Sequence, residues 1–131
     1  MAKIIRAVAG VLCKDNLVLM AQRPQDKSHA GYWEFPGGKI EADESTFEAL
    51  IRELKEEIGV DVRTLHLTHL ISITQSYPHG DVYLDVVLVN CWDGEVIGLE
   101  GQALYWQNID QACVQYPLLL TTEKIFEVLR S

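Results

Sequence analysis

The sequence predicts a protein of the α/β class, in the α+β arrangement, with a mixed β-sheet that carries helices on its faces. Three observations support this prediction. Strand-like apolar runs occur near the start of the chain and again after its middle, a segment with helical periodicity lies between them at residues 45–58, and a second helical segment comes last. Strands on both sides of a central helix bury their apolar residues most simply in one shared sheet, which the helices then cover.

The first elements are predicted to form a hairpin. Residues 3–13 are strand-like, residues 14–16 (Lys-Asp-Asn) have turn chemistry, and residues 17–22 supply the partner strand. Residues 23–37 are predicted to be loop, because they are rich in Pro, Asp, Ser, His and Gly, with only a short apolar piece near their end. Residues 36–38 (Pro-Gly-Gly) are predicted to interrupt regular structure.

A helix is predicted over residues 45–58. Its apolar side chains recur at spacings of three and four, so that one face of the helix collects Phe47, Leu50, Ile51, Leu54 and Ile58. Gly59 is a suitable C-terminal stop, because glycine adopts the left-handed conformation that often ends a helix. This apolar face is expected to lie against the core.

The second half of the chain repeats the pattern. Strands are predicted at about 65–75 and 82–91, and a short strand at 104–106 (Leu-Tyr-Trp). Residues 116–117 (Tyr-Pro) precede a last helix, predicted at about 118–130. No internal repeat or linker interrupts this order, so residues 1–131 are expected to form a single domain.

Length and composition indicate a small soluble domain. The chain has 131 residues, of which 48% are hydrophobic, enough for one core. Nothing resembles a signal peptide, and no apolar run approaches the roughly 18–20 residues that cross a bilayer, so a cytoplasmic protein without membrane contacts is expected. An odd number of cysteines, three, argues against a disulfide framework.

The charge of the chain restricts its partners. The formal net charge is −8 and the pI is about 4.8. Such a surface repels nucleic-acid backbones, so a nucleic-acid polymer is not an expected partner. A small polyanionic substrate would be repelled too, and would need a cation to bridge it to the protein.

The predicted helix carries a stripe of glutamates beside its apolar face. Glu53, Glu56 and Glu57 form this stripe, and Arg52 lies at its edge, one turn before Glu56. Like charges one turn apart destabilise a helix, so a helix built for stability alone would alternate them with lysines. A solvated helix face is the alternative interpretation. A divalent cation such as Mg²⁺ explains the cluster better, since it takes carboxylate and carbonyl ligands and bridges to phosphates.

The spacing of these residues resembles a known motif. Gly38 is followed after five residues by Glu44. After seven more residues comes the run from Arg52 to Val60, which reads RELKEEIGV. This pattern resembles the Nudix box at every fixed position. The resemblance implies the Nudix fold, a mixed β-sheet sandwiched between helices, and a metal-dependent hydrolase of nucleoside-diphosphate-linked substrates. A looser similarity to the MutT branch, the nucleoside triphosphate pyrophosphohydrolases, extends over residues 34–41, Arg23, 92–95, 100–102 and 116–117.

The resemblance implies roles for the acidic residues. The expected metal ligands are Glu53, Glu56 and Glu57, the carbonyl of Gly37, and a distal glutamate, Glu100; the expected metal is Mg²⁺, with Mn²⁺ as a substitute. The general base is expected to be Glu53, with Glu100 as the competing candidate.

Two further residues of the box are expected to support the acidic ones. Arg52 is expected to orient a glutamate through a salt bridge. Glu44 is expected to support the loop or a further metal.

Candidate substrate contacts are more widely spread. Arg23 and Lys39 are candidates for phosphate contact, although Arg23 also fits an ordinary surface arginine. The base pocket is expected between the sheet and the loops around residues 23–35, 76–85 and 117–122. Its candidate base contacts, for which core packing or a solvent-facing position is the alternative, are Phe35, Tyr77, Asp85 and Thr121.

The implied reaction is hydrolysis of (deoxy)nucleoside triphosphates to the monophosphate and pyrophosphate, in nucleotide-pool housecleaning. Family members that act on oxidised guanine use an asparagine just after a Phe-Pro-like element near the C-terminal helix, and the corresponding residues 116–122 contain none. A threonine hydroxyl does not reproduce the paired contacts of an amide. A preference other than, or broader than, 8-oxo-dGTP is therefore expected.

Several alternatives stay open: an 8-oxo-dGTP-specific enzyme, a dinucleoside polyphosphate hydrolase suggested by Tyr77, an ADP-ribose or nucleotide-sugar hydrolase, and a non-catalytic nucleotide-binding module. The expected oligomeric state is a monomer or a weak homodimer.

Overall fold

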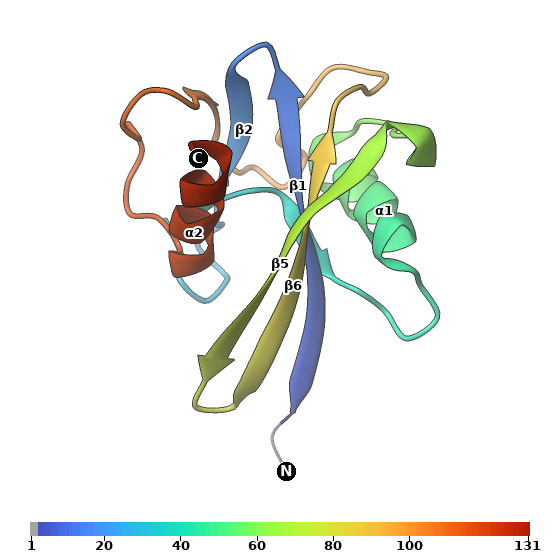
Figure 1. The fold of residues 1–131 in the computed structure, drawn as a ribbon, viewed down its shortest axis with the longest axis vertical. Helices are drawn as coiled ribbons and strands as arrows, with labels where there is room; N and C mark the ends of the chain where they lie inside the picture. The colour runs from blue at the N-terminus through green and yellow to red at the C-terminus, as the bar shows by residue number, and fades with distance from the viewer. Residues whose placement is uncertain (1–2) are drawn as a thin grey trace.

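The computed structural model describes residues 3–131, and these form one mixed sheet with a helix on either side (Figure 1). In chain order the elements are β1 (Ile4–Lys14), β2 (Leu17–Gln22), β3 (Trp33–Glu34), β4 (Gly37–Lys39), α1 (Thr46–Ile58), the 3-10 turn η1 (Thr64–His66), β5 (Leu67–Tyr77), β6 (Gly80–Val89), β7 (Leu104–Asn108) and α2 (Leu120–Leu129).

The long strand β1 holds the sheet together. Its first part pairs in parallel with β6 and antiparallel with β4, while its end pairs antiparallel with β2. Strand β2 in turn pairs with β3 and β7, and β5 borders β6. Because one pairing is parallel and the others are antiparallel, the predicted mixed sheet is confirmed.

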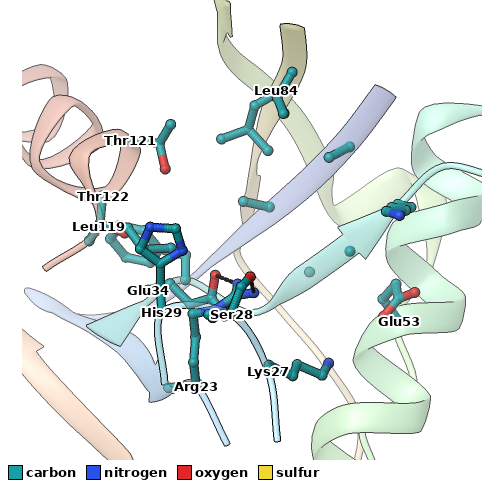
Figure 2. A pocket seen from close by; sticks show the side chains of 18 of the residues that line it. Arg23, Lys27, Ser28, His29, Glu34, Glu53, Leu84, Leu119, Thr121 and Thr122 are labelled. Carbon is teal, nitrogen blue, oxygen red and sulfur yellow. Dashed lines mark hydrogen bonds and ion pairs between the residues drawn. The ribbon is translucent and has the colours of Figure 1, made fainter. Parts of the chain in front are cut away.

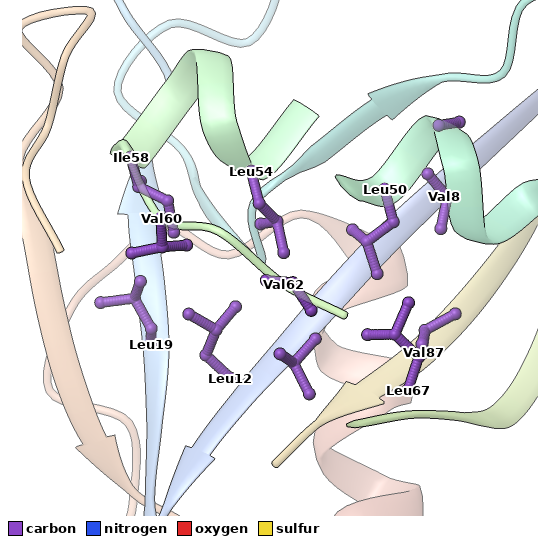
Figure 3. Close-up of a cluster of buried hydrophobic side chains, with 12 residues drawn as sticks. Val8, Leu12, Leu19, Leu50, Leu54, Ile58, Val60, Val62, Leu67 and Val87 are labelled. Atoms are coloured by element: carbon purple, nitrogen blue, oxygen red, sulfur yellow. The ribbon is translucent and has the colours of Figure 1, made fainter. Parts of the chain in front are cut away.

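Alternation along the strands divides the core between the two faces. On β1, Val8 and Leu12 point to the α1 face, whereas Ala9 and Val11 point to the α2 face. Figure 3 shows the α1-side cluster, in which Leu50, Leu54 and Ile58 of α1 pack over β1, β2 and β6. Phe126 of α2 belongs to the cluster on the opposite face. The α/β/α sandwich expected from the sequence is therefore confirmed.

Helix α1 has strong start and stop signals. Ser45 accepts a hydrogen bond from the backbone N–H of Glu48, and the Glu48 side chain accepts one from the backbone N–H of Ser45, which forms a capping box. Gly59 ends the helix in the left-handed conformation with φ of 73°. The predicted helix at 45–58 differs from the observed one only by its capping residue.

The Pro-Gly-Gly stretch corrects the sequence interpretation. Residues 36–38 were predicted to interrupt regular structure, yet Gly37 and Gly38 begin strand β4 and pair with Ala9 and Val8 of β1. A Cβ on Gly37 would lie 2.0 Å from the carbonyl oxygen of Val8. The glycines thus allow a close backbone approach that any side chain would prevent.

The remaining elements lie near their predicted places. The short strand predicted at 104–106 extends to Asn108, the last helix is shorter at both ends than 118–130, and η1 was not predicted. Cys13, Cys91 and Cys113 are free thiols. In the described part of the chain, no helix is both long and apolar enough to cross a membrane.

Candidate active site

A cavity of about 710 Å³ opens on the α2 side of the sheet and reaches the glutamates of α1. Its floor comes from β1 and β6, and further walls come from the β2–β3 loop, the start of β4, the β5–β6 turn and the start of α2. Figure 2 shows Leu84 and Thr121 at one end of this space and Glu53 at the other. The loops that surround it are those expected from the sequence to form the base pocket.

Glu53 lies directly beside the glycine strand β4. A Cβ on Gly38 would come within 2.6 Å of the Glu53 carboxyl carbon, so only glycine leaves room for this side chain. Gly37, Gly38 and Glu53 all line the cavity. The two glycines of β4 therefore allow two close contacts: Gly37 with the backbone of β1, and Gly38 with the Glu53 carboxylate of α1.

Arg52 organises the carboxylates around it. Its Nε and NH2 donate to the two oxygens of Glu44 at 2.6 and 2.8 Å, and its NH1 donates to Oε1 of Glu53 at 2.8 Å. NH2 also donates to the carbonyl of Lys39 in β4, at 3.1 Å. This geometry is what the orienting role of Arg52 requires, because the guanidinium ties α1, β4 and the loop before α1 to one another.

Glu44 is held as an anion by its partners. Hydrogen bonds from Arg52, and then from the backbone N–H of Glu41, lower the pKa of Glu44 to about 2. Glu44 in turn is the main cause that raises the pKa of Arg52, with Glu53 contributing less. Since both oxygens of Glu44 are occupied by Arg52, the structure favours the loop-supporting role of Glu44 over that of a metal ligand.

The surroundings of Glu57 disfavour its charged form, whereas those of Glu44 favour it. Burial is the largest cause that raises the pKa of Glu57 well above the ordinary range of a glutamate. A hydrogen bond with Glu53 raises it further, and so do the negative charges of Glu53, Glu100 and Glu34. The cavity end formed by α1 is therefore a place where carboxylates gather without enough positive charge.

The loop that carries Glu100 is attached to the end of α1. The backbone N–H of Leu99 and the side-chain amide of Gln102 both donate to the carbonyl of Glu57, at 3.0 Å each. The amide oxygen of Gln102 accepts from the backbone N–H of Glu100 at 2.9 Å. These bonds use carbonyl groups that the last turn of a helix leaves unpaired, and they bring Glu100 to the cavity.

The donor set fits a hard divalent cation. Glu53, Glu57 and Glu100 line one end of the cavity together with Gly37, and their mutual repulsion is what a cation would relieve. Glu56, the remaining predicted ligand, does not line the cavity; its side chain is 58% exposed and lies 3.5 Å from Arg52. Among residues 3–131, no three acidic or thiol or imidazole side chains already converge in metal-binding geometry. A bound ion would therefore require side-chain rotation to complete its ligand shell.

The two predicted phosphate contacts differ in availability. Lys39 lines the cavity and is exposed. Arg23 also lines it, but NH1 donates to both oxygens of Glu34 at 3.0 and 3.2 Å, and Nε donates to the carbonyl of Ser28 at 2.7 Å. Glu34 keeps a raised pKa because burial outweighs the lowering effect of Arg23. Arg23 is thus more than an ordinary surface arginine, since it anchors the β2–β3 loop.

Three of the four predicted base contacts line the cavity. Phe35 is 3% exposed and packs against Phe126 with ring centroids 5.3 Å apart, so it has a core role as well. Tyr77 is exposed and stacks on His79 at 5.9 Å, and Thr121 lies at the start of α2. The structure brings these residues to one space, from three distant segments of the chain.

The structure corrects the predicted role of Asp85. This residue was predicted as a base contact, but it does not line the cavity, because its neighbour Leu84 takes the cavity face of β6. Asp85 points to the α1 face, is 7% exposed, and accepts hydrogen bonds from Thr46 at 2.9 Å and from Ser72 at 2.8 Å. His69 lies 3.5 Å from it. Asp85 therefore fastens the first residue of α1 to the sheet.

Several cavity residues were not singled out from the sequence. They are Lys27, Ser28, His29, Glu34, His79, Gln102 and Thr122. The similarity over residues 34–41 and 100–102 contained Glu34 and Gln102, and so gave a signal for these two. The others lie on turns or at a helix start, where no periodicity indicates the direction of a side chain.

The family of the chain follows from this geometry together with its sequence relatives. Residues 3–129, almost the whole described chain, match the family model of the NUDIX domain. The chain belongs to the Nudix family. The resemblance inferred from the box is thus confirmed, and the sandwich fold is that of Nudix proteins.

Similar proteins point to the MutT-like branch of the Nudix family. The chain is 38% identical over 116 residues to the CTP pyrophosphohydrolase of Escherichia coli K12, covering 88% of this chain and 84% of that protein. It is 42% identical over 100 residues to the 8-oxo-dGTP diphosphatase of Proteus vulgaris, covering 76% of this chain and 88% of that protein.

Solved structures agree with the sequence relatives. The E. coli ORF135 protein, solved in solution, superposes with a TM-score of 0.83 at 35% identity, over 98% of this chain and 89% of that one. A MutT Nudix hydrolase from Burkholderia pseudomallei shares the fold with a TM-score of 0.86 at 23% identity, over 97% of this chain and 98% of that one. The protein is accordingly a Nudix hydrolase, a pyrophosphohydrolase of small nucleotide substrates, from a family that uses divalent metals.

Proposed function

We propose that this Nudix protein hydrolyses (deoxy)nucleoside triphosphates to the monophosphate and pyrophosphate. The observation that carries the proposal is the polarity of its cavity. One end gathers Glu53, Glu57 and Glu100, and the other is lined by apolar side chains such as Phe35 and Leu84. A nucleotide has the complementary division, with a charged phosphate chain at one end and a flat base at the other.

The acidic end supports dependence on Mg²⁺, with Mn²⁺ as a substitute. Glu53, Glu57, Glu100 and the Gly37 carbonyl would hold the ion, with Glu56 joining after rotation away from Arg52. Such an ion supplies charge neutralisation for the phosphate oxygens and lowers the pKa of a bound water. It would also offset the net charge of −8 that otherwise repels the substrate.

Glu53 is the proposed general base. It lies at the cavity surface, and Arg52 holds its Oε1, so that its orientation is fixed before substrate arrives. In this role it accepts the proton of the water that attacks the β-phosphorus, while the bond from that phosphorus to the oxygen of the departing monophosphate breaks. Glu100 is the competing base, and its exposed position on a loop favours the ligand role instead.

The base preference is proposed to be other than, or broader than, 8-oxo-dGTP. Thr121 and Thr122 occupy the start of α2, and the side-chain amides that line the cavity are those of Gln22 and Gln102; no asparagine is among the lining residues that the structure describes. A hydroxyl offers a single donor and cannot form the paired contacts of an amide.

Specificity for 8-oxo-dGTP is the second candidate, because the relative from P. vulgaris carries that name at 42% identity. The CTP pyrophosphohydrolase relative covers more of the chain and favours the first proposal. Hydrolysis of dinucleoside polyphosphates rests on Tyr77, which lines the cavity but is 37% exposed at its edge.

The test is a substrate panel with Mg²⁺. Purified protein is incubated with canonical and oxidised (d)NTPs, ADP-ribose and diadenosine polyphosphates, and released pyrophosphate is measured separately from orthophosphate. We expect pyrophosphate from at least one canonical (d)NTP at a kcat/KM no lower than that for 8-oxo-dGTP. Pyrophosphate from no (d)NTP would refute the proposal, and a clear preference for 8-oxo-dGTP would establish the second candidate.

Two further proposals accompany this function. We propose that the chain is a single domain that acts as a monomer or a weak homodimer, and that its role is housecleaning of the nucleotide pool. Light scattering across a range of concentrations tests the first. The second predicts an increased mutation frequency in a strain that lacks the gene, and no increase would contradict it.

A further inference from the structure

The cavity is lined by one arginine and two lysines, and only the arginine side chain already has partners. Arg23 is committed to Glu34 and to the carbonyl of Ser28. Lys39, exposed at the end of β4, is bound only through its backbone carbonyl, which accepts from Arg52; its ammonium has no hydrogen bond or ion pair within residues 3–131. Lys27 likewise has neither a hydrogen bond nor an ion pair from its side chain in this part of the chain, but it lies on the loop that Arg23 anchors.

The loop around Lys27 is fixed at several points. The backbone N–H of Lys27 donates to the carbonyl of Pro24 at 3.2 Å, which closes a turn. Gly31 donates to the carbonyl of Arg23 at 3.0 Å, and the Arg23 side chain reaches Ser28 inside the same loop. Lys27 is therefore exposed on a loop whose path is set by the Arg23–Glu34 pair, and is not on a free tail.

The direction of the Lys27 side chain can be followed in Figure 2. It extends from the β2–β3 loop toward the side of the cavity where Glu53 projects from α1. Its charge also lowers the pKa of the half-buried carboxylate of Glu34, as a smaller effect than that of Arg23. An ammonium that faces an acidic cavity without forming an ion pair keeps all its donors available for a ligand.

We propose that Lys27 binds the phosphate chain of the nucleotide, at the β- and γ-phosphates that become the pyrophosphate product, and so shares the phosphate-contact role for which Arg23 and Lys39 were the sequence candidates. This inference rests on the proposed function and names a specificity residue within it. A contact to the β- and γ-phosphates would strengthen binding of triphosphates and leave monophosphate binding unchanged. Arg23 acts as the positioning residue that places this loop.

The first experiment compares Lys27→Met with Lys14→Met, which removes the same charge at the end of β1, outside the cavity. In wild type and both variants, kcat and KM are measured with the best (d)NTP of the panel. We expect Lys27→Met to raise KM about tenfold, as the loss of a charge-assisted contact would, with kcat changed by less than about threefold. Lys14→Met should match wild type, and Lys27→Arg should recover most of the loss.

The second experiment does not depend on turnover. Binding of inorganic pyrophosphate and of the nucleoside monophosphate is measured by calorimetry with Mg²⁺ present. We expect Lys27→Met to weaken pyrophosphate binding about tenfold and to leave monophosphate binding unchanged. Equal pyrophosphate affinity in wild type and Lys27→Met would overturn the inference. So would an equal loss in Lys14→Met, which would indicate a general charge effect.

The two hypotheses fail in different ways. A wild-type protein that releases pyrophosphate from no (d)NTP refutes the proposed function, whatever Lys27 does. A wild-type protein that is active while Lys27→Met keeps its KM and pyrophosphate affinity refutes only the role of Lys27. Circular dichroism and thermal unfolding of each variant establish that the fold is retained.

Discussion

The two ends of helix α1 each meet a carboxylate withdrawn from solvent, and the two carboxylates are treated in opposite ways. At the N-terminal end, Asp85 accepts hydrogen bonds from Thr46 and Ser72, and His69 lies beside it. At the C-terminal end, Glu57 has Glu53, Glu100 and Glu34 as its charged neighbours. The helix dipole favours the first arrangement and opposes the second, because negative charge is stabilised at the N-terminus and destabilised at the C-terminus.

This difference separates the structural part of the helix from its chemical part. Asp85 has partners from β5 and α1, so it contributes to stability and needs nothing from outside the chain. Glu57 lacks such partners, and the proposed cation would relieve its repulsion. A carboxylate cluster that costs stability is expected where selection acts on chemistry.

The largest expected effect is on catalysis at the C-terminal end. Glu53→Gln keeps the shape of the side chain and removes its basicity, so kcat should fall by at least about 10²–10⁴. The melting temperature should stay within a few degrees of wild type. Steady-state kinetics with the best (d)NTP and a thermal melt check both statements, and Glu127→Gln on the exposed side of α2 is the matched control. Turnover near the wild-type rate in Glu53→Gln would reject Glu53 as the base and direct the same test to Glu100→Gln.

The next effect concerns stability at the N-terminal end. Asp85→Ala leaves the hydroxyls of Thr46 and Ser72 without their acceptor, and should lower the free energy of unfolding by about 2–3 kcal/mol. Because Asp85 lies outside the cavity, kcat at a temperature well below the melt should change little. Urea unfolding and kinetics on the same sample test the separation. A large loss of kcat without a loss of stability would show that this end, too, takes part in the chemistry.

A smaller effect of opposite sign is expected for Glu57→Gln. Because folding raises the pKa of Glu57, its protonation stabilises the folded state. This contribution is complete below about pH 4.3, the usual pKa of a glutamate in an unfolded chain, and it is lost as the pH rises toward the pKa in the folded protein. At a pH above that range, with EDTA present to remove metal ions, the variant should therefore be more stable than wild type by about 1 kcal/mol, a few degrees in melting temperature. Added Mg²⁺ should stabilise wild type and have less effect on the variant. A variant less stable than wild type in EDTA would contradict the repulsion inferred at this site.

The smallest expected effect belongs to Glu44, which is paired within the loop before α1. Its lowered pKa of about 2 gives a contribution to stability that is present above about pH 4.3 and is lost as the pH falls toward 2. The urea midpoints of wild type and Glu44→Gln should therefore differ at neutral pH and converge between pH 4.3 and 2. A difference that stays constant over this range would mean that Glu44 acts through shape and not through charge.

Much of the framework could be predicted because it follows from periodic patterns. Helix α1 carries an apolar stripe, a capping box and a terminal glycine, and all three agree. Strand β4 could not be predicted, since its glycines resemble a loop until the backbone of β1 is placed against them. Glu53 and Glu57, two of the glutamates proposed to bind the metal, were predicted from the box, whose spacing on a helix places them on one side.

The base end of the cavity was harder to predict, because it depends on which face of a strand a residue takes. Asp85 and Leu84 differ by one position on β6, and that one position decides between the α1 face and the cavity. Lys27 depends on a loop path that the Arg23–Glu34 pair creates, and this pair joins residues whose proximity no local pattern indicates.

The attachment of residues 97–102 to the end of α1 has a consequence for protein engineering. The backbone N–H groups of Ile97 and Leu99 and the amide of Gln102 saturate carbonyls of Ile58 and Glu57, and the same segment delivers Glu100. The glutamate helix is therefore not a portable module. A designer who grafts it onto another scaffold must transplant this segment with it, or the graft will have both a frayed terminus and an incomplete acidic cluster.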